Sequence, residues 1–156
     1  LIAVSLFAGA KFKDTKWAFI IPAVSFFMSD VILSYMNHYD LFHDTIFFTY
    51  ASIVLIVLLG RILNNQKFSF GKTFGLTIAS SLLFFIISNF GVWLFGNMYS
   101  MNIEGLINCY VMAIPFNKYS VLGDLFFVAV LFGIYEFVSA KYFTNSDTFA
   151  WQKSKK

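Results

Sequence analysis

The sequence predicts an all-α fold, a polytopic bundle of transmembrane helices. Only 12% of the 156 residues are charged and 59% are hydrophobic, whereas soluble domains carry about 25% charged residues. The apolar residues come in long blocks, with a mean hydropathy of +0.74, and not in the alternating pattern of a membrane β-barrel. The net charge of +3 lies in the connecting segments, where it indicates topology in a lipid bilayer and not nucleic-acid binding.

Five segments are apolar enough to form spans, which need about 20 residues each. We expect one transmembrane domain over residues 1–140 and a polar, basic tail over 141–156. The expected spans are 1–12, 17–36, 45–63, 73–95 and 119–140.

The first span is short, and it begins inside an apolar run that has no initiator Met. We therefore expect further residues, including a further helix, upstream of Leu1. Ser5 and Gly9 form a small-xxx-small pair, a pattern that allows another helix to approach closely.

The second span contains Pro22 near its start, which membrane helices tolerate, and Asp30 in its interior. A charged side chain at the centre of a span costs about 2.5–3.5 kcal/mol. Two interpretations remain open. Asp30 lines a cavity and binds a substrate or a cation, or it is a hydrogen-bonded or protonated structural residue.

Basic residues give the orientation of the spans. Segment 11–16 has three, segment 61–72 has three, and the chain from residue 141 onward has four, while 37–44 and 96–102 have none. The positive-inside rule places the three basic segments, including the C-terminus, in the cytoplasm.

This orientation makes 103–118 begin and end on the outer side. We expect a helix over 103–116 that is outer-side or re-entrant and breaks at Pro115, before the last span begins at 119. The alternative is a short span over this segment, which would export the tail.

Three amides and a carboxylate lie in apolar surroundings: Asn89, Asn108, Asn117 and Asp124. Amides in spans hydrogen-bond between helices or orient a ligand. Asp124 lies one turn into the last span, where it would face the outer side or interact with the helix dipole. Glu136, near the other end of that span, is expected to pair with Lys141.

A metal site is a weaker prediction. His38 and His43 lie with two aspartates between residues 38 and 44, and Cys109 is the single cysteine. Imidazole and thiolate bind transition metals, but a polar loop and a small buried hydrophobe are the ordinary interpretations. We expect no cofactor. No nucleophile–base pair, phosphate-binding loop or HExxH motif is present, so we do not expect an enzyme.

Three short stretches suggest a family: SNFGVW at 88–93, CYVMAIPF at 109–116 and GDL at 123–125. Over residues 1–138 the sequence resembles small bacterial membrane proteins of unknown function that are described only as candidate transport proteins.

More distantly, Pro115-Phe116-Asn117 and Asn89-Phe90-Gly91 resemble motifs of the S component, the substrate-binding subunit of energy-coupling-factor vitamin transporters. That resemblance implies a six-helix bundle in the bacterial inner membrane, with its first helix upstream of this sequence. It also implies a vitamin-like or modified-base substrate held near the outer face, a transmembrane coupling subunit and partner ATPases. The expected polar lining is Asp30, Asn89, Asn108, Asn117 and Asp124. The alternative is a structural or accessory subunit of a larger membrane complex.

Overall fold

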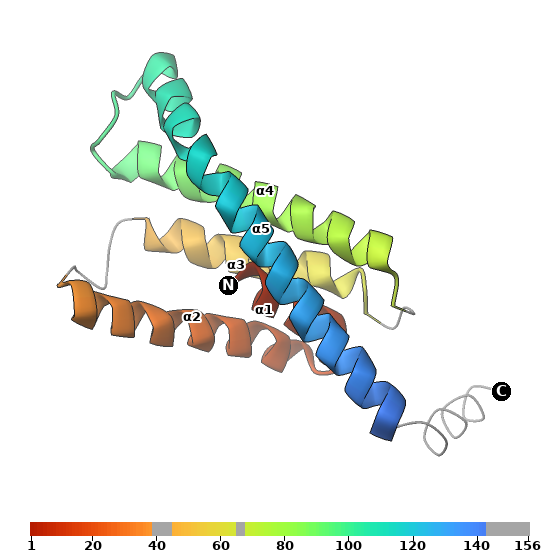
Figure 1. Ribbon diagram of the computed structural model, residues 1–156. Helices are drawn as coiled ribbons and strands as arrows, with labels where there is room; N and C mark the ends of the chain where they lie inside the picture. Colours follow the sequence, from red (N-terminus) through yellow and green to blue (C-terminus); the bar gives the residue numbers. More distant parts are fainter. Residues whose placement is uncertain (39–44, 65–67, 143–156) are drawn as a thin grey trace.

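The computed structural model describes residues 1–38, 45–64 and 68–142, and this part of the chain is all-helical. It contains five helices, shown in Figure 1. They are α1 (Ile2–Lys11), α2 (Thr15–Asn37), α3 (Ile46–Arg61), α4 (Phe70–Phe95) and α5 (Ile103–Tyr142). The expected tail over 143–156 lies outside the described residues.

Among the described helices, α2, α4 and α5 are long and apolar enough to cross a membrane. The sequence predicted a span in each of these three regions. The other two helices are apolar but shorter, with 10 residues in α1 and 16 in α3. At 1.5 Å per residue α3 is about 24 Å long, less than the hydrocarbon thickness of about 30 Å. It ends at Arg61 and not at Leu63, and Asn64 of the following turn donates to the end of α1.

Helix α1 is the centre of the bundle. It contacts each of the other four helices, and in Figure 1 it lies in the middle of the molecule, behind α5. Most of its side chains are buried: Ile2, Ala3, Ser5, Leu6, Ala8, Gly9 and Ala10. Their small average size allows several helices to approach at once.

The closest approach is between α1 and α3, at Gly9 and Gly60. A Cβ atom added to Gly60 would lie 2.5 Å from the Leu6 carbonyl oxygen and 3.0 Å from the Gly9 Cα atom. A Cβ atom added to Gly9 would collide with the Val57 carbonyl oxygen. The two backbones therefore touch, and the small-xxx-small interpretation of Ser5 and Gly9 is confirmed, since Ser5 is fully buried as well.

Polar contacts hold the C-terminal end of α1. The Arg61 Nη1 atom donates to the Phe12 carbonyl oxygen at 2.7 Å. The Asn64 side-chain amide donates to the Gly9 and Phe12 carbonyl oxygens at 3.4 and 3.3 Å. These donors satisfy carbonyls that a helix end leaves without partners, and the positive charge of Arg61 complements the helix dipole.

The same end of α1 is joined to α5 by an ion pair. Lys11 Nζ lies 2.7 Å from Glu136 Oε1 and 4.3 Å from the ring centroid of Tyr135. The sequence led us to expect a pair between Glu136 and Lys141 on the same helix. The structure gives Glu136 an ion-pair partner 125 residues away in sequence, a contact that depends on how α1 and α5 pack.

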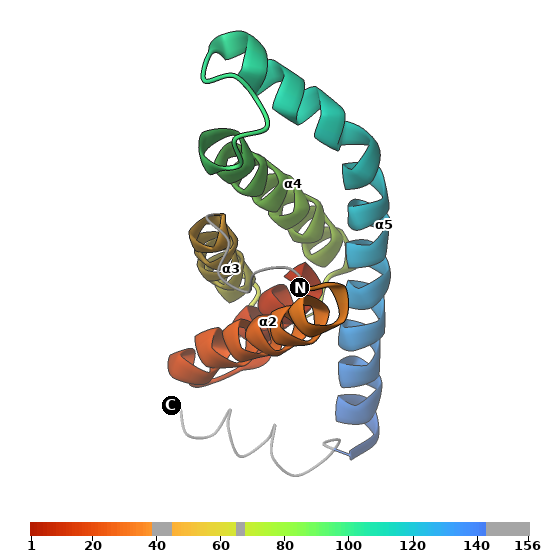
Figure 2. The ribbon, with the colours of Figure 1, turned by 90° about the vertical axis from the view of Figure 1, so that its left-hand side faces the viewer.

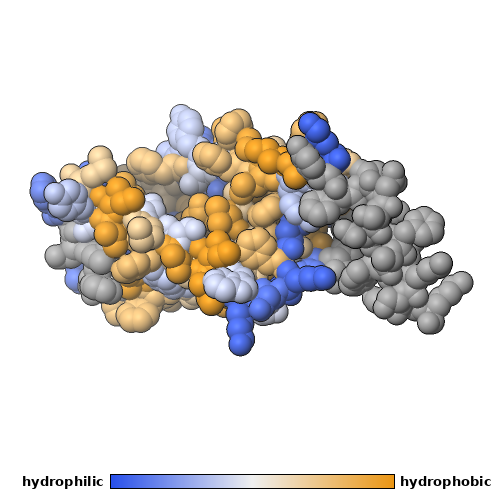
Figure 3. All heavy atoms as spheres, turned by 90° about the horizontal axis from the view of Figure 1, so that it is seen from below, coloured by the Kyte–Doolittle hydropathy of each residue, from blue (hydrophilic) through white to orange (hydrophobic). Residues whose placement is uncertain are grey.

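The described basic segments gather at one end of the bundle. The α1–α2 turn, the C-terminal ends of α3 and α5 and the N-terminal end of α4 all lie toward the right of Figure 1. On the face shown in Figure 3, apolar side chains are concentrated between more hydrophilic ends. This arrangement is the one expected of a bundle with an apolar middle and interfacial ends.

Helix α5 differs from the prediction. It is one continuous helix of 40 residues, so the expected break at Pro115 and the separate helix over 103–116 are wrong. Proline inside a helix removes one backbone hydrogen bond and bends the helix without necessarily ending it. Figure 2 shows such a bend in the teal part of α5, the region that includes Pro115. At about 60 Å, α5 is twice as long as the hydrocarbon layer is thick, and it crosses the other helices obliquely in Figure 1.

We predict that Gly60→Ala destabilises the protein by about 1–3 kcal/mol, because overpacking at a backbone contact forces the helices apart. The measurement is thermal unfolding in detergent micelles. Gly133→Ala is the matched control, since nothing lies within 4 Å of the Cβ atom that it adds. If the Gly60→Ala variant unfolded at the same temperature as the wild type, this result would contradict the close approach of α1 and α3.

Candidate functional site

Side-chain hydrogen bonds join α4 to α5 at two places. Ser81 Oγ donates to Asp124 Oδ2 at 2.8 Å. Nearer the other end, the Tyr110 hydroxyl donates to the Ile86 carbonyl oxygen at 2.7 Å, and Cys109 Sγ donates to the Asn89 carbonyl oxygen at 3.4 Å. The two helices are thus held together at two places about four turns apart along α5.

Between these two anchors lies an open groove of about 260 Å³. Residues from both helices line it: Phe84, Phe85, Ser88 and Asn89 from α4, and Ala113, Phe116, Asn117 and Ser120 from α5. The residues from α5 recur at spacings of three and four, so they share the helix face that also carries Cys109 and Asp124. The groove therefore follows the line along which α5 faces α4.

Pro115 explains why space remains there. It is exposed, and its position in the sequence places it on the side of α5 opposite the groove. A helix bends away from its proline because the ring clashes with the preceding turn. In Figure 2 the concave side of α5 faces α4, so α5 arches over the groove between its two anchors.

The lining combines aromatic rings with neutral polar groups and contains no charged side chain. The Asn89 Nδ2 atom donates to the Phe85 carbonyl oxygen at 2.8 Å, which leaves the amide oxygen and the second N–H of Asn89. Asn117 and the hydroxyls of Ser88 and Ser120 add donors and acceptors. Such a surface can bind a small solute through ring contacts and a few directed hydrogen bonds.

The structure brings together part of the predicted polar lining. Asn89 and Asn117 both line the groove. Asp124 follows Ser120 by one turn on the same face, and its carboxylate is already bonded to Ser81. Asn108 is exposed and does not line the groove.

Asp30 lies apart from these residues. It is only 8% exposed, and its Oδ2 atom is buried without a hydrogen-bond partner among the described residues. Tyr50 of α3 lies within electrostatic range of it. In the described part of the chain α2 contacts α1 and α3 but neither α4 nor α5, and Asp30 does not line the α4–α5 groove.

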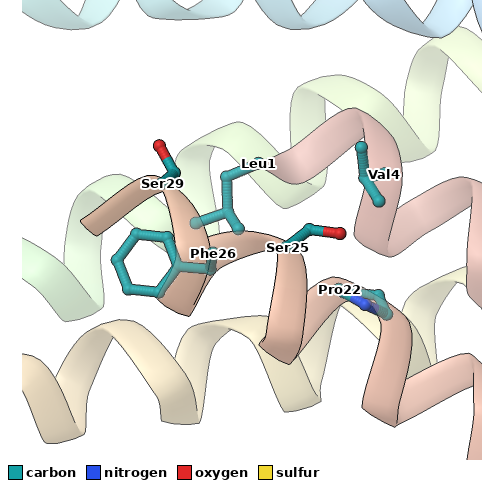
Figure 4. Close-up of a pocket in the computed structure, with 6 residues that line it drawn as sticks. All are labelled: Leu1, Val4, Pro22, Ser25, Phe26 and Ser29. Atoms are coloured by element: carbon teal, nitrogen blue, oxygen red, sulfur yellow. The ribbon is translucent and has the colours of Figure 1, made fainter. Parts of the chain in front are cut away.

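A second cavity, of about 200 Å³, lies between α1 and α2. Figure 4 shows its lining residues, Leu1, Val4, Pro22, Ser25, Phe26 and Ser29. It offers two hydroxyl groups in an otherwise apolar wall. The α4–α5 groove, with two amides as well as two hydroxyls, has more means of recognising a solute.

Two of the three metal candidates, His38 and Cys109, lie within the described residues. His38 follows α2 as its C-cap residue, with a left-handed φ of 56°, whereas His43 lies outside the described residues. Within residues 1–38, 45–64 and 68–142, no three His, Cys, Asp or Glu side chains are grouped as a metal site would require. Cys109 is 2% exposed and packs as a small residue against α4.

Three residues of this interface were not predicted from the sequence: Ser81, Ser88 and Tyr110. Ser81 and Ser88 are seven residues apart in an apolar span and therefore lie on one helix face, a spacing that was available from the sequence. The hydrogen bond of Tyr110 depends on how α4 and α5 cross, and no local sequence pattern predicts it.

These features define an α-helical membrane protein with a polar and aromatic groove between its two longest helices. The chain belongs to a family of unknown function (DUF6580), which matches residues 1–149. No curated protein and no solved structure matches the chain. Membership of a family without an established function agrees with the first resemblance above. The comparisons provide no support for the likeness to S components.

We predict that the Ser81–Asp124 hydrogen bond couples α4 to α5. Ser81→Ala should destabilise the protein by about 1–3 kcal/mol, because it leaves a half-buried carboxylate oxygen without its donor. The measurement is a double-mutant cycle, which compares the free energies of unfolding of Ser81→Ala, Asp124→Asn and the double variant. Strictly additive effects would show that the two residues do not interact.

We also predict that Cys109 is chemically protected. Its reaction with N-ethylmaleimide in the folded protein should be about tenfold slower than that of an exposed thiol, because the reagent needs an accessible thiolate. The matched control carries Asn108→Cys with Cys109→Ala, which moves the thiol to the neighbouring exposed position. Equal labelling rates at the two positions would contradict the buried contact with Asn89.

Proposed function

We propose that the protein is a substrate-binding membrane subunit that takes up a small molecule across the bacterial inner membrane, in the manner of an S component. The chain binds and moves its solute without transforming it. A vitamin-like or modified-base solute is the class that the sequence resemblance suggests.

The observation that carries this proposal is the groove between α4 and α5. It combines a concave surface, three phenylalanine rings and two amides, the general composition of small-molecule sites. Its residues lie toward the α4–α5 turn, away from the basic end of the bundle. Under the positive-inside rule that half faces the outer side, where an uptake protein must capture its solute.

The remaining parts of the proposal follow the same resemblance. The sequence has no phosphate-binding loop, so a transmembrane coupling subunit and partner ATPases would supply the energy for release. The six-helix bundle that the resemblance implies would need one helix beyond the five in the described part of the chain. The C-terminal tail, rich in lysine, would lie in the cytoplasm.

A second candidate function is a structural or accessory subunit of a larger membrane complex. One observation favours it. Gly71 and Gly75 of α4 are exposed, and nothing lies within 4 Å of a Cβ atom added to either. Two glycines four residues apart form a face on which another membrane helix can pack closely.

Native purification with mass spectrometry separates the two functions. Transport predicts a stoichiometric small molecule that co-purifies with the protein. Stable protein partners without any bound small molecule would favour the accessory role and overturn the transport proposal.

For the co-purified molecule, we predict that Asn117→Ala lowers cellular uptake about tenfold, the effect of losing one good hydrogen bond in a desolvated site. Asn108→Ala is the matched control, since it removes the same amide from an exposed position outside the groove, and it should retain uptake. Equal uptake by both variants would remove Asn117 from the site. Asp30→Ala tests the separate carboxylate on α2 in the same assay.

A further inference from the structure

We infer that the α4–α5 groove accepts a neutral, flat heteroaromatic solute that presents an N–H donor next to a hydrogen-bond acceptor. This inference rests on the proposed function and specifies the class of solute for the same groove. It follows from the ring surfaces, the lack of charge and the orientation of one amide.

The ring surfaces favour a flat solute. Phe85 is held by Tyr110, with the ring centroids 5.7 Å apart and the ring planes at 65°. Tyr110 is itself fixed, because its hydroxyl donates to the Ile86 carbonyl oxygen. Phe84 lines the same wall, and Phe116, 76% exposed, stands on the α5 side. Aromatic side chains pack best against other rings, edge-on or with offset faces.

The absence of charge in the lining favours a neutral solute. The carboxylate next to the groove, Asp124, already accepts a hydrogen bond from Ser81. A charged group placed among the phenylalanine rings would lose its hydration without gaining a counter-charge, which is strongly unfavourable.

The hydrogen bond of Asn89 sets the polarity of the solute. Its Nδ2 atom is bound to the Phe85 carbonyl oxygen, which can only accept, so the assignment of the amide nitrogen is fixed by chemistry. The Oδ1 atom and the second Nδ2 hydrogen remain, an acceptor next to a donor, and they call for the complementary donor and acceptor on the solute. Asn117, across the groove on α5, offers both a donor and an acceptor.

The size of the groove favours a small solute. Its 260 Å³ is just below the range of drug-sized pockets, which begins at about 300 Å³. A fused two-ring system matches this volume better than a larger cofactor does.

The test uses quinazoline-2,4-dione, a neutral flat probe with N–H donors next to carbonyl acceptors, and its 1,3-dimethyl derivative, which has no N–H donor. Isothermal titration calorimetry on the full chain in lipid nanodiscs gives the dissociation constants. We expect the parent probe to bind about tenfold more tightly than the dimethyl probe. Asn89→Ala should abolish this difference, and the matched control Asn108→Ala should retain it.

Equal binding of the two probes to the wild type would overturn the inferred class, and this comparison needs no variant. Preservation of the difference in a folded Asn89→Ala protein would overturn the role of Asn89. Tighter binding of quinoline-2-carboxylate, a flat anion, would overturn the neutral class. These results decide only the class of solute, because transport itself is decided by co-purification and uptake.

Discussion

The contact between Gly9 and Gly60 is the constraint on which the rest of the bundle depends. Inside a membrane, helices gain little from hiding apolar surface from one another, so close packing and hydrogen bonds must hold them together. With no side chain on either residue, the backbones of α1 and α3 touch. This proximity brings Arg61 and Asn64 within reach of the carbonyl groups at the end of α1.

The consequences extend to the longest helix. Once α1 is fixed against α3, Lys11 projects toward α5 and forms the ion pair with Glu136, while Leu6 packs in the same core as Val128 and Phe132 of α5. The basic end of α5 is thereby tied to the centre of the bundle. Its other half reaches α4 through Tyr110 and Cys109, and the bend in the region of Pro115 leaves the groove between. The scaffold and the proposed site therefore occupy different parts of one helix.

The polar groups predicted as a single lining lie in two separate regions of the bundle. On one side, Asp30 of α2 is buried near α3 with one oxygen atom unpartnered among the described residues. On the other side, Asn89 of α4 and Asn117 of α5 both line the α4–α5 groove. In the described part of the chain α2 contacts neither α4 nor α5, whereas α1 contacts all of the other helices.

The sequence by itself determined the helical membrane class, an apolar segment in the region of each of the three long helices, and the pairing of Ser5 with Gly9 as a contact face. Each of these depends on composition, length or spacing within one segment, which the bilayer and the helix repeat fix directly. Local rules failed at Pro115, where the helix continues through the expected break, and they did not predict the ion pair of Glu136 with Lys11 of α1. Only the tertiary structure decided that Asn89 and Asn117 share a groove while Asn108 and Asp30 do not. That outcome depends on how each helix is rotated and crossed against its neighbours, and no single segment of sequence encodes it.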